Sequence, residues 1–264
     1  MVLAMLALFA AGLLALPPRS LITLARQNTP SPQNAEQEPP SSAPEEPSSR
    51  TVVLDPAHGG ADFGARGPTG LAESDVVLDF ARAARIALEA QRIRVLLTRE
   101  GNQNPSFNDR SAMVNGLHNA LFVSLHVSSS GPVGTARAYY YLFPANLAPA
   151  ATSQNTAPVA AAHASLVEWD HAQQRSIDLS RQLAAFVQTE LLHRFKGSPE
   201  TPIAAPVRQL RTIAAPAIAI EISSIDVTDA KRLDQMAQPL ADAIGRAVAE
   251  FPLPAPPGAS SGGH

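Results

Sequence analysis

Short apolar runs of strand length recur between residues 51 and 251, and polar segments separate them. The runs are rich in β-branched and aromatic residues, as TVVL (51–54) and LFVSL (121–125) illustrate. Such runs are typical of strands that are buried in a sheet. The predicted strands are 51–54, 93–97, 121–125, 136–143 and 217–222, with 207–210 as a further short candidate.

Segments with helical spacing of their apolar residues lie between these runs. Ser74 is placed to cap a first helix, along which Val77, Phe80, Ala84, Ala87 and Leu88 keep that spacing. Further helices are predicted over 107–117, 176–195 and 228–251, the last as one helix or two.

This alternation of strands and helices predicts an α/β fold. We expect a single layered domain with a mixed, mostly parallel sheet and helices on both faces. In such sheets the active site lies beyond the carboxyl ends of the strands.

The first 26 residues form an apolar leader. Val2–Leu16 is continuously small and apolar, and Pro17-Pro18-Arg19 ends it. As a helix the run is shorter than the ~30 Å hydrocarbon core, so it resembles the core of a signal peptide more than a full membrane span. Both a signal peptide and a membrane anchor remain open, and a buried helix of the domain is the alternative.

Two further segments lack the residues that build a core. Residues 27–50 are rich in Pro, Ser, Glu and Gln and contain no Leu, Ile, Val or aromatic residue, which predicts a disordered tether. Residues 252–264 predict a disordered tail, which leaves 51–251 as the catalytic domain. A leader followed by a tether is the layout of a cell-envelope protein, periplasmic or extracellular, that is secreted or membrane-tethered.

Composition excludes several kinds of partner and site. The net charge is −3, from 20 basic and 23 acidic residues, so nucleic acid is not an expected partner. The chain has no cysteine, which excludes disulfides, a catalytic thiol and thiolate metal sites. Any metal ligands must therefore be His, Asp or Glu.

Polar side chains with metal-binding or catalytic potential fall at the predicted strand ends. His58 and His126 follow two strands, and Glu73 precedes the first helix. Two His and one carboxylate make an open zinc set, yet each residue also has a structural interpretation, and the spacing is too long for a compact motif. Glu221 lies inside the strand AIAIEI, where a carboxylate is costly to bury without a partner or a function.

Four blocks of this sequence resemble the zinc-dependent N-acetylmuramoyl-L-alanine amidases, the family often called amidase type 3. The first is VVLDPAHGGADFGARGPTGLAESDVVLDFA (52–81), with a strand, an Asp-Pro-x-His-Gly-Gly turn and a Glu that heads a helix. The likeness continues in VLLTRE (95–100), NDRSAMVNGLHNALFVSLHVS (108–128) and PAIAIEISSIDVTDAKRL (216–233). The blocks keep the family's order and cover most of residues 51–250.

The resemblance implies a function and a role for each polar residue. It implies zinc ligation by His58, Glu73 and His126, with Glu221 as the catalytic carboxylate. The reaction it implies is hydrolysis of the amide between the muramic-acid lactyl group and L-alanine in peptidoglycan. We expect a monomer whose partner is peptidoglycan, and we leave an activator protein open. Asp55 is a candidate acceptor for a ligand imidazole, with organisation of the turn as the alternative.

The chain also departs from the family pattern, and the departures keep two alternatives open. Ala57 replaces a Gly in the turn, and Ser128 replaces an Asn. After Glu221, where the family typically has Gly-Phe and then Ser-Asn, this chain has Ile222-Ser223-Ser224-Ile225-Asp226. One alternative is a catalytically inactive peptidoglycan-binding or regulatory domain, and the other is a zinc peptidase that acts on stem peptides. Residues 144–168 form an insertion that predicts either a surface loop or a cover for the metal.

Overall fold

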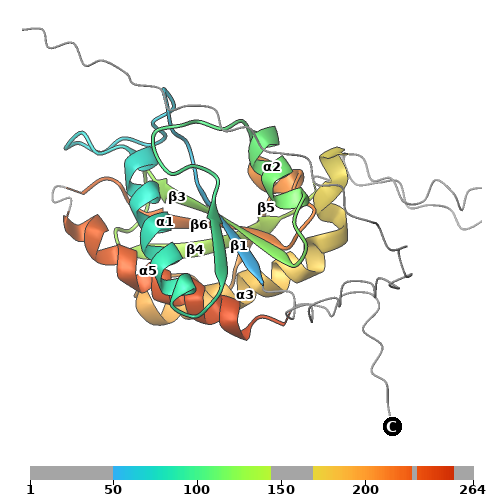
Figure 1. Cartoon of the computed structure of the whole chain (residues 1–264). Coiled ribbons are helices and arrows are strands. Elements are labelled where there is room, and N and C mark those ends of the chain that lie inside the picture. The colour runs from blue at the N-terminus through green and yellow to red at the C-terminus, as the bar shows by residue number, and fades with distance from the viewer. Residues whose placement is uncertain (1–49, 144–168, 228–230, 253–264) are drawn as a thin grey trace, which may run out of the picture. The chain divides into compact units, whose positions relative to one another are not determined.

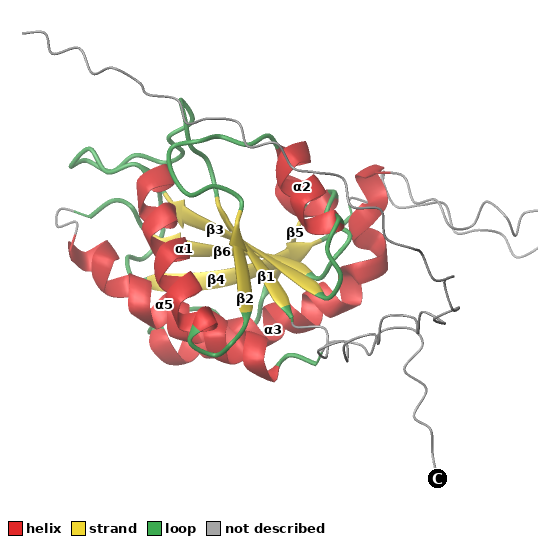
Figure 2. Ribbon diagram, in the orientation of Figure 1, coloured by secondary structure: helices red, strands yellow, loops and turns green. Residues whose placement is uncertain are grey.

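A six-stranded mixed sheet forms the centre of the protein (Figures 1 and 2). The computed structural model describes residues 50–143, 169–227 and 231–252. The strand order is β2-β1-β3-β6-β4-β5. The strands are β1 (Thr51–Pro56), β2 (Arg94–Leu97), β3 (Ala120–Ser128), β4 (Thr135–Tyr141), β5 (Ile203–Ala205) and β6 (Ala217–Ser223).

The strand directions confirm a mixed and mostly parallel sheet. β2, β1, β3 and β6 run parallel as neighbours, and only the β4–β6 pair is antiparallel. β5 then pairs parallel with β4 at the edge. Because β1, β3 and β6 are parallel neighbours, their carboxyl ends lie along one edge of the sheet.

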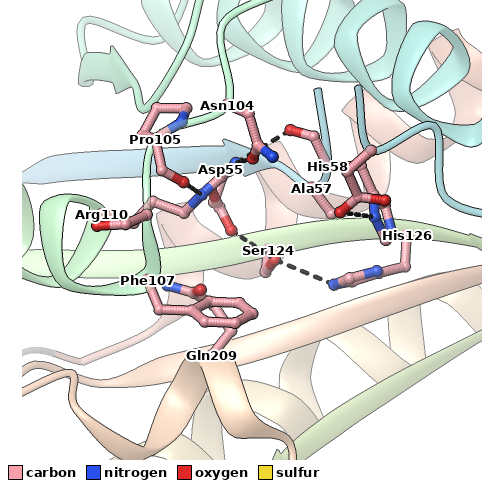
Figure 3. Close-up of a pocket in the computed structure, with 12 residues that line it drawn as sticks. Asp55, Ala57, His58, Asn104, Pro105, Phe107, Arg110, Ser124, His126 and Gln209 are labelled. Carbon is pink, nitrogen blue, oxygen red and sulfur yellow. Dashed lines mark hydrogen bonds and ion pairs between the residues drawn. The ribbon is translucent and has the colours of Figure 1, made fainter. Parts of the chain in front are cut away.

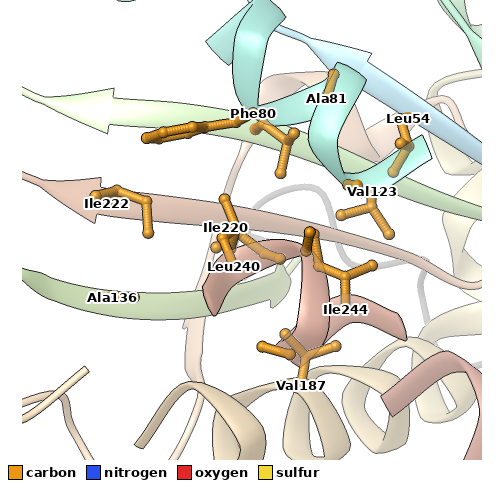
Figure 4. Packing of buried hydrophobic residues seen from close by; sticks show 14 of the residues in the cluster. Leu54, Phe80, Ala81, Val123, Ala136, Val187, Ile220, Ile222, Leu240 and Ile244 are labelled. Carbon is orange, nitrogen blue, oxygen red and sulfur yellow. The ribbon is translucent and has the colours of Figure 1, made fainter. Parts of the chain in front are cut away.

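Helices cover both faces of the sheet, as predicted. The helical elements are α1 (Glu73–Glu89), α2 (Phe107–Asn115), η1 (Trp169–Ser176, a 3-10 helix), α3 (Ile177–Arg194), α4 (Arg208–Arg211) and α5 (Lys231–Glu250). The larger core joins α1, α3 and α5 to one face, where Phe80, Val187 and Ile244 pack against Val123 and Ile220 (Figure 4). A smaller core joins α2 and α4 to the other face through residues such as Val114 and Leu210.

The prediction of a strand over 207–210 was wrong. The segment forms α4, which begins after Val207. Val207 and Leu210 both pack into the smaller core, and their spacing of three suits one helical turn rather than the alternation of a strand. The neighbouring strand is β5, Ile203–Ala205, whose three residues are too few to show a period.

The predicted cap of the first helix was also wrong. α1 begins at Glu73, its N-cap is Ala72, and no side chain caps it. Ser74 is instead buried in the first turn, where its carbonyl accepts a hydrogen bond from Arg99 Nη2 at 2.7 Å. The backbone N–H groups of Glu73 and Ser74 donate to the carbonyls of Ala65 and Phe63, so loop backbone replaces a side-chain cap.

The predicted leader (1–26), the predicted tether (27–50) except its last residue, the insertion (144–168) and most of the tail lie outside the described residues. Within 50–143, 169–227 and 231–252, no helix is both long and apolar enough to cross a membrane.

Candidate metal centre

Three elements bring His58, Glu73 and His126 together at the carboxyl edge of the sheet. His58 follows β1 by two residues, His126 lies near the end of β3, and Glu73 is the first residue of α1. β1 and β3 pair up to Pro56 and Leu125, so the two histidines leave the sheet beside each other. The three residues form a group whose candidate ligand atoms all lie within 4.8 Å of one another.

The donor atoms of this group have the spacing of a metal site. His58 Nε2 lies 3.2 Å from Glu73 Oε2, and His126 Nδ1 lies 3.2 Å from Glu73 Oε1. In a tetrahedral zinc site with bonds of about 2.0–2.2 Å, neighbouring donor atoms lie roughly 3.3 Å apart. Two imidazoles and one carboxylate at this spacing fit a zinc ion and leave its fourth position open.

Backbone hydrogen bonds fix the Glu73 carboxylate in its place. The N–H of Val127 donates to Oε1 at 3.0 Å, and the N–H of Ala65 donates to Oε2 at 2.8 Å. Burial alone would raise the pKa of Glu73, but the hydrogen bonds from His126, His58 and the Ala65 N–H outweigh it and hold that pKa well below its usual range. The Glu73 carboxylate is therefore ionised and held in one orientation, although the residue is only 5% exposed.

His58 is positioned by an unusual backbone conformation and by a second carboxylate. Its φ of 63° is left-handed, and its Nδ1 lies 2.9 Å from Asp62 Oδ2. The hydrogen bond to Glu73 is the main cause that raises the pKa of His58 to about 9; burial opposes this shift, and Asp62 adds to it. Asp62 thus orients the ring so that Nε2 faces the centre.

Gly64 lets the loop pass close to these ligands. A Cβ at this position would lie 2.5 Å from Glu73 Oε2 and 2.7 Å from His58 Cδ2. The backbone is also left-handed there, with φ +63°. Only glycine therefore fits where the loop crosses the metal centre.

Glu221 lies beside the metal group on the neighbouring strand. It pairs in register with His126 across β3 and β6, so both side chains leave the same face of the sheet. Tyr139 donates its hydroxyl to Glu221 Oε1 at 3.3 Å, and Arg137 Nε lies 3.9 Å from the same oxygen. The side chain is 29% exposed, so a substrate can reach the carboxylate.

Asp55 organises the turn and does not contact an imidazole directly. It accepts hydrogen bonds from Thr98 Oγ1 at 2.6 Å and from Ser124 Oγ at 2.7 Å, and it forms a buried ion pair with Arg110. Ser124 Oγ in turn lies 3.3 Å from His126 Nε2, so Asp55 reaches the ligand only through this hydroxyl.

Two buried arginines hold the backbone that carries His58. Arg110 donates to the carbonyls of Pro56 and His58, and Arg99 donates to those of Pro56 and Ala57. Arg110 therefore has a role in the fold of the turn. Arg99 and Asp62 were missed, because a loop of unknown geometry gives no periodic signal for which side chains meet.

A pocket of about 390 Å³ opens beside the metal group (Figure 3). His58 and His126 lie at one end, Phe107 and Gln209 lie at the other end, and Asp55 and Ser124 lie between them. The remaining lining residues are Ala57, Asp62, Asn104, Pro105, Ser106 and Arg110. This volume lies in the range of small-ligand sites.

Comparison with known proteins gives one family. The family model described as N-acetylmuramoyl-L-alanine amidase matches residues 52–250. The sporulation-specific N-acetylmuramoyl-L-alanine amidase of Bacillus subtilis is 38% identical over 107 residues, which cover 40% of each chain. The amidase AmiA of Escherichia coli is 42% identical over 77 residues, 29% of this chain and 27% of the relative. The matches thus span less than half the length of these curated relatives.

Solved structures share the fold. An N-acetylmuramoyl-L-alanine amidase from Clostridium difficile superposes with a TM-score of 0.56 at 23% identity, over 77% of this chain and 97% of that one. The CwlD amidase of Clostridioides difficile, solved in complex with the GerS lipoprotein, gives 0.57 at 18% identity, over 77% and 98%. The predicted α/β fold class is confirmed by these likenesses.

Proposed function

Since this chain belongs to the N-acetylmuramoyl-L-alanine amidase family, we propose that it hydrolyses the amide between the N-acetylmuramoyl lactyl group and L-alanine in peptidoglycan. The observation that carries the proposal is the convergence of His58, Glu73 and His126 within 4.8 Å. Glu221 lies beside them in register with His126. A metal-ligand set next to a reachable carboxylate is one arrangement that catalyses amide hydrolysis.

The group that these three residues hold is proposed to be a zinc ion. When bound, zinc supplies Lewis acidity for the scissile carbonyl and lowers the pKa of a water molecule. His58 and His126 each present one ring nitrogen to the Glu73 carboxylate, and both nitrogens must be unprotonated to bind the metal. Asp62 keeps His58 in the tautomer with its proton on Nδ1.

Glu221 is proposed to move the proton. Its carboxylate accepts a proton from the attacking water and passes it to the departing alanine nitrogen, because an amide leaves poorly as an anion. The hydroxyl of Tyr139 and the guanidinium of Arg137 both contact Oε1 of Glu221. Oε2 of Glu221 is then the oxygen that is proposed to carry the proton.

One assay separates this reaction from its two alternatives. Purified peptidoglycan is digested with the full-length zinc-loaded protein, and the products are identified by mass spectrometry. The amidase is expected to release stem peptides with a free L-alanine amine. Trimmed stem peptides would instead indicate a zinc peptidase, and no product would indicate a binding or regulatory domain.

Removal of the Asp62 carboxylate is expected to weaken zinc binding about 10–100-fold, as outer-shell partners of metal ligands do. The reason is that Asp62→Ala leaves His58 Nδ1 without its acceptor at 2.9 Å, so the ring loses its fixed orientation. Competition with a fluorescent zinc chelator measures the affinity directly. Asp178→Ala, at an exposed ion pair with Arg181, is the matched control. Equal zinc affinity in the Asp62 variant and this control would show that Asp62 does not support zinc binding.

The segments before the domain are proposed to place the enzyme in the cell envelope. Residues 1–26 act as a signal peptide or anchor, and 27–50 as a tether, because this composition leaves little to pack. Cell fractionation of a fluorescent fusion should find the full chain with the envelope and a chain without residues 1–50 in the cytoplasm. Envelope localisation of both would contradict this assignment. The monomer, and a possible activator, stay predictions.

A further inference from the structure

Gln209 presents a buried amide without hydrogen-bond partners to the end of the pocket that is remote from the metal group. The residue is 5% exposed and belongs to α4. Neither its Nε2 nor its Oε1 has a hydrogen-bond partner within the described part of the chain. Gln209 lines the same pocket as His58 and His126, at the end where Phe107 lies (Figure 3).

An unpaired buried amide is costly, and most native structures avoid it. Gln188 shows how this fold pairs a structural glutamine. Its Oε1 accepts from the Ala138 N–H at 2.7 Å, and its Nε2 donates to the Pro199 carbonyl at 2.7 Å. Gln209 has neither contact, although it is almost as deeply buried. The free energy that this costs the unliganded fold is recovered if a ligand supplies the two missing partners.

The chemistry of the amide defines that ligand. A glutamine side chain offers one N–H donor and one carbonyl acceptor on the same side. An extended peptide residue presents its own N–H and C=O side by side and satisfies both at once. In a trans acetamido group the N–H and C=O point in opposite directions, so such a group satisfies only one. A carboxylate would satisfy the donor alone, and a cation the acceptor alone.

The rest of the pocket suits a short peptide. Pro105 and the ring of Phe107 give it an apolar wall, and Ser124 and Asn104 give it polar sides. Phe107 is 43% exposed, and the guanidinium of Arg208 lies 4.7 Å from its ring centroid. The ring therefore lies partly at the surface, at the same end of the pocket as Gln209.

We propose that Gln209 recognises the peptide backbone of the stem next to the scissile amide, by a pair of hydrogen bonds to the N–H and C=O of one extended residue. This inference rests on the proposed amidase function, and it assigns the stem peptide to the pocket between the metal group and α4. Gln209 is then a specificity residue that discriminates peptide backbones and does not take part in the proton transfer.

The test compares Gln209→Met with Gln188→Met in the full-length zinc-loaded protein. If Gln209 is unpaired until substrate binds, its replacement by an apolar side chain of similar size raises the melting temperature by a few degrees. The same change at Gln188 breaks two hydrogen bonds and lowers it. The stem dipeptide with a free L-alanine amine is then titrated by calorimetry, and Gln209→Met should weaken its binding about 10-fold or more.

Kinetics with two substrates locates the contact. One is a muramoyl dipeptide, and the other carries an N-methyl group on the peptide nitrogen after L-alanine, which removes the donor. The wild type should prefer the first by about 10–100-fold in kcat/KM, and Gln209→Met should lose that preference, mainly through KM. Removal of the N-acetyl group from the sugar of the substrate should leave the ratio of kcat/KM between wild type and Gln209→Met unchanged.

Three results would overturn the proposal. The first is a Gln209→Met protein that is destabilised as Gln188→Met is, and the second is a Gln209→Met protein that binds the dipeptide as tightly as the wild type. The third is a kcat/KM ratio between wild type and Gln209→Met that changes when the acetamido group of the sugar is removed. If Gln209→Met does not fold, Gln209→Glu retains the size and the acceptor but loses the donor, so it must bind the dipeptide more weakly and still prefer the substrate with the peptide N–H. A wild type that binds the dipeptide but hydrolyses neither substrate would refute the proposed function and leave the peptide site standing.

Discussion

Replacement of Glu221 by glutamine is expected to abolish most hydrolysis while the fold and the bound zinc remain. The amide cannot accept the proton of the attacking water, and general acid–base catalysis contributes roughly 10²–10⁴-fold. The exchange is nearly isosteric, so Tyr139 can keep its hydrogen bond to Oε1. The measurement is kcat on a soluble muropeptide, with zinc content determined on the same sample.

The matched control is Glu89→Gln, which removes an exposed carboxylate at the end of α1 opposite to Glu73. It should hydrolyse the muropeptide at the wild-type rate. A Glu221→Gln enzyme within a few-fold of that rate would exclude Glu221 from the proton transfer. Loss of zinc in this variant would instead show that Glu221 supports the ligand set, since it lies in register with His126.

Loss of either histidine should empty the metal site and end the activity. His58→Ala and His126→Ala each remove one of three donors that lie within 4.8 Å of one another. The remaining two donors no longer enclose a tetrahedral ion, so the affinity should fall by more than the 10–100-fold of an outer-shell change. After dialysis, elemental analysis should find about one zinc per wild-type chain and almost none per variant.

His118→Ala is the control for these two variants, because His118 is exposed and outside the ligand group. It should retain full zinc occupancy. Chelation of the wild-type enzyme should abolish activity, and added zinc should restore it. Full zinc occupancy in both ligand variants would disprove the assignment of this site.

The sequence by itself determined the fold class and the edge of the sheet where chemistry occurs. Apolar runs alternating with helical segments predicted an α/β layer, and parallel neighbours place their carboxyl ends together. His58, His126 and Glu221 could therefore be predicted to lie near one edge of the sheet, since the two histidines follow predicted strands and Glu221 lies near the end of a third. Their separation along the chain, from residue 58 to residue 221, hides the site from any compact motif.

The roles of these residues came from the resemblance to a family, because each also has a structural interpretation when taken alone. A histidine after a strand and a glutamate at a helix start are common without a metal. The structure brings the Glu73 carboxylate within 3.2 Å of both imidazoles, and this proximity supports the proposed roles.

Only the tertiary structure decided which side chains surround the ligands. Asp62 faces His58 because the backbone there takes a left-handed turn, and no periodicity announces such a turn. Arg110 reaches Asp55 across 55 positions of sequence, and Gln209 reaches the pocket because one turn of helix replaces a predicted strand. The spacing of apolar residues and the helix or strand propensity of each residue describe one segment of the chain at a time. Contacts such as these depend on how loops and short elements pack against one another, and that packing is settled only when the whole domain folds.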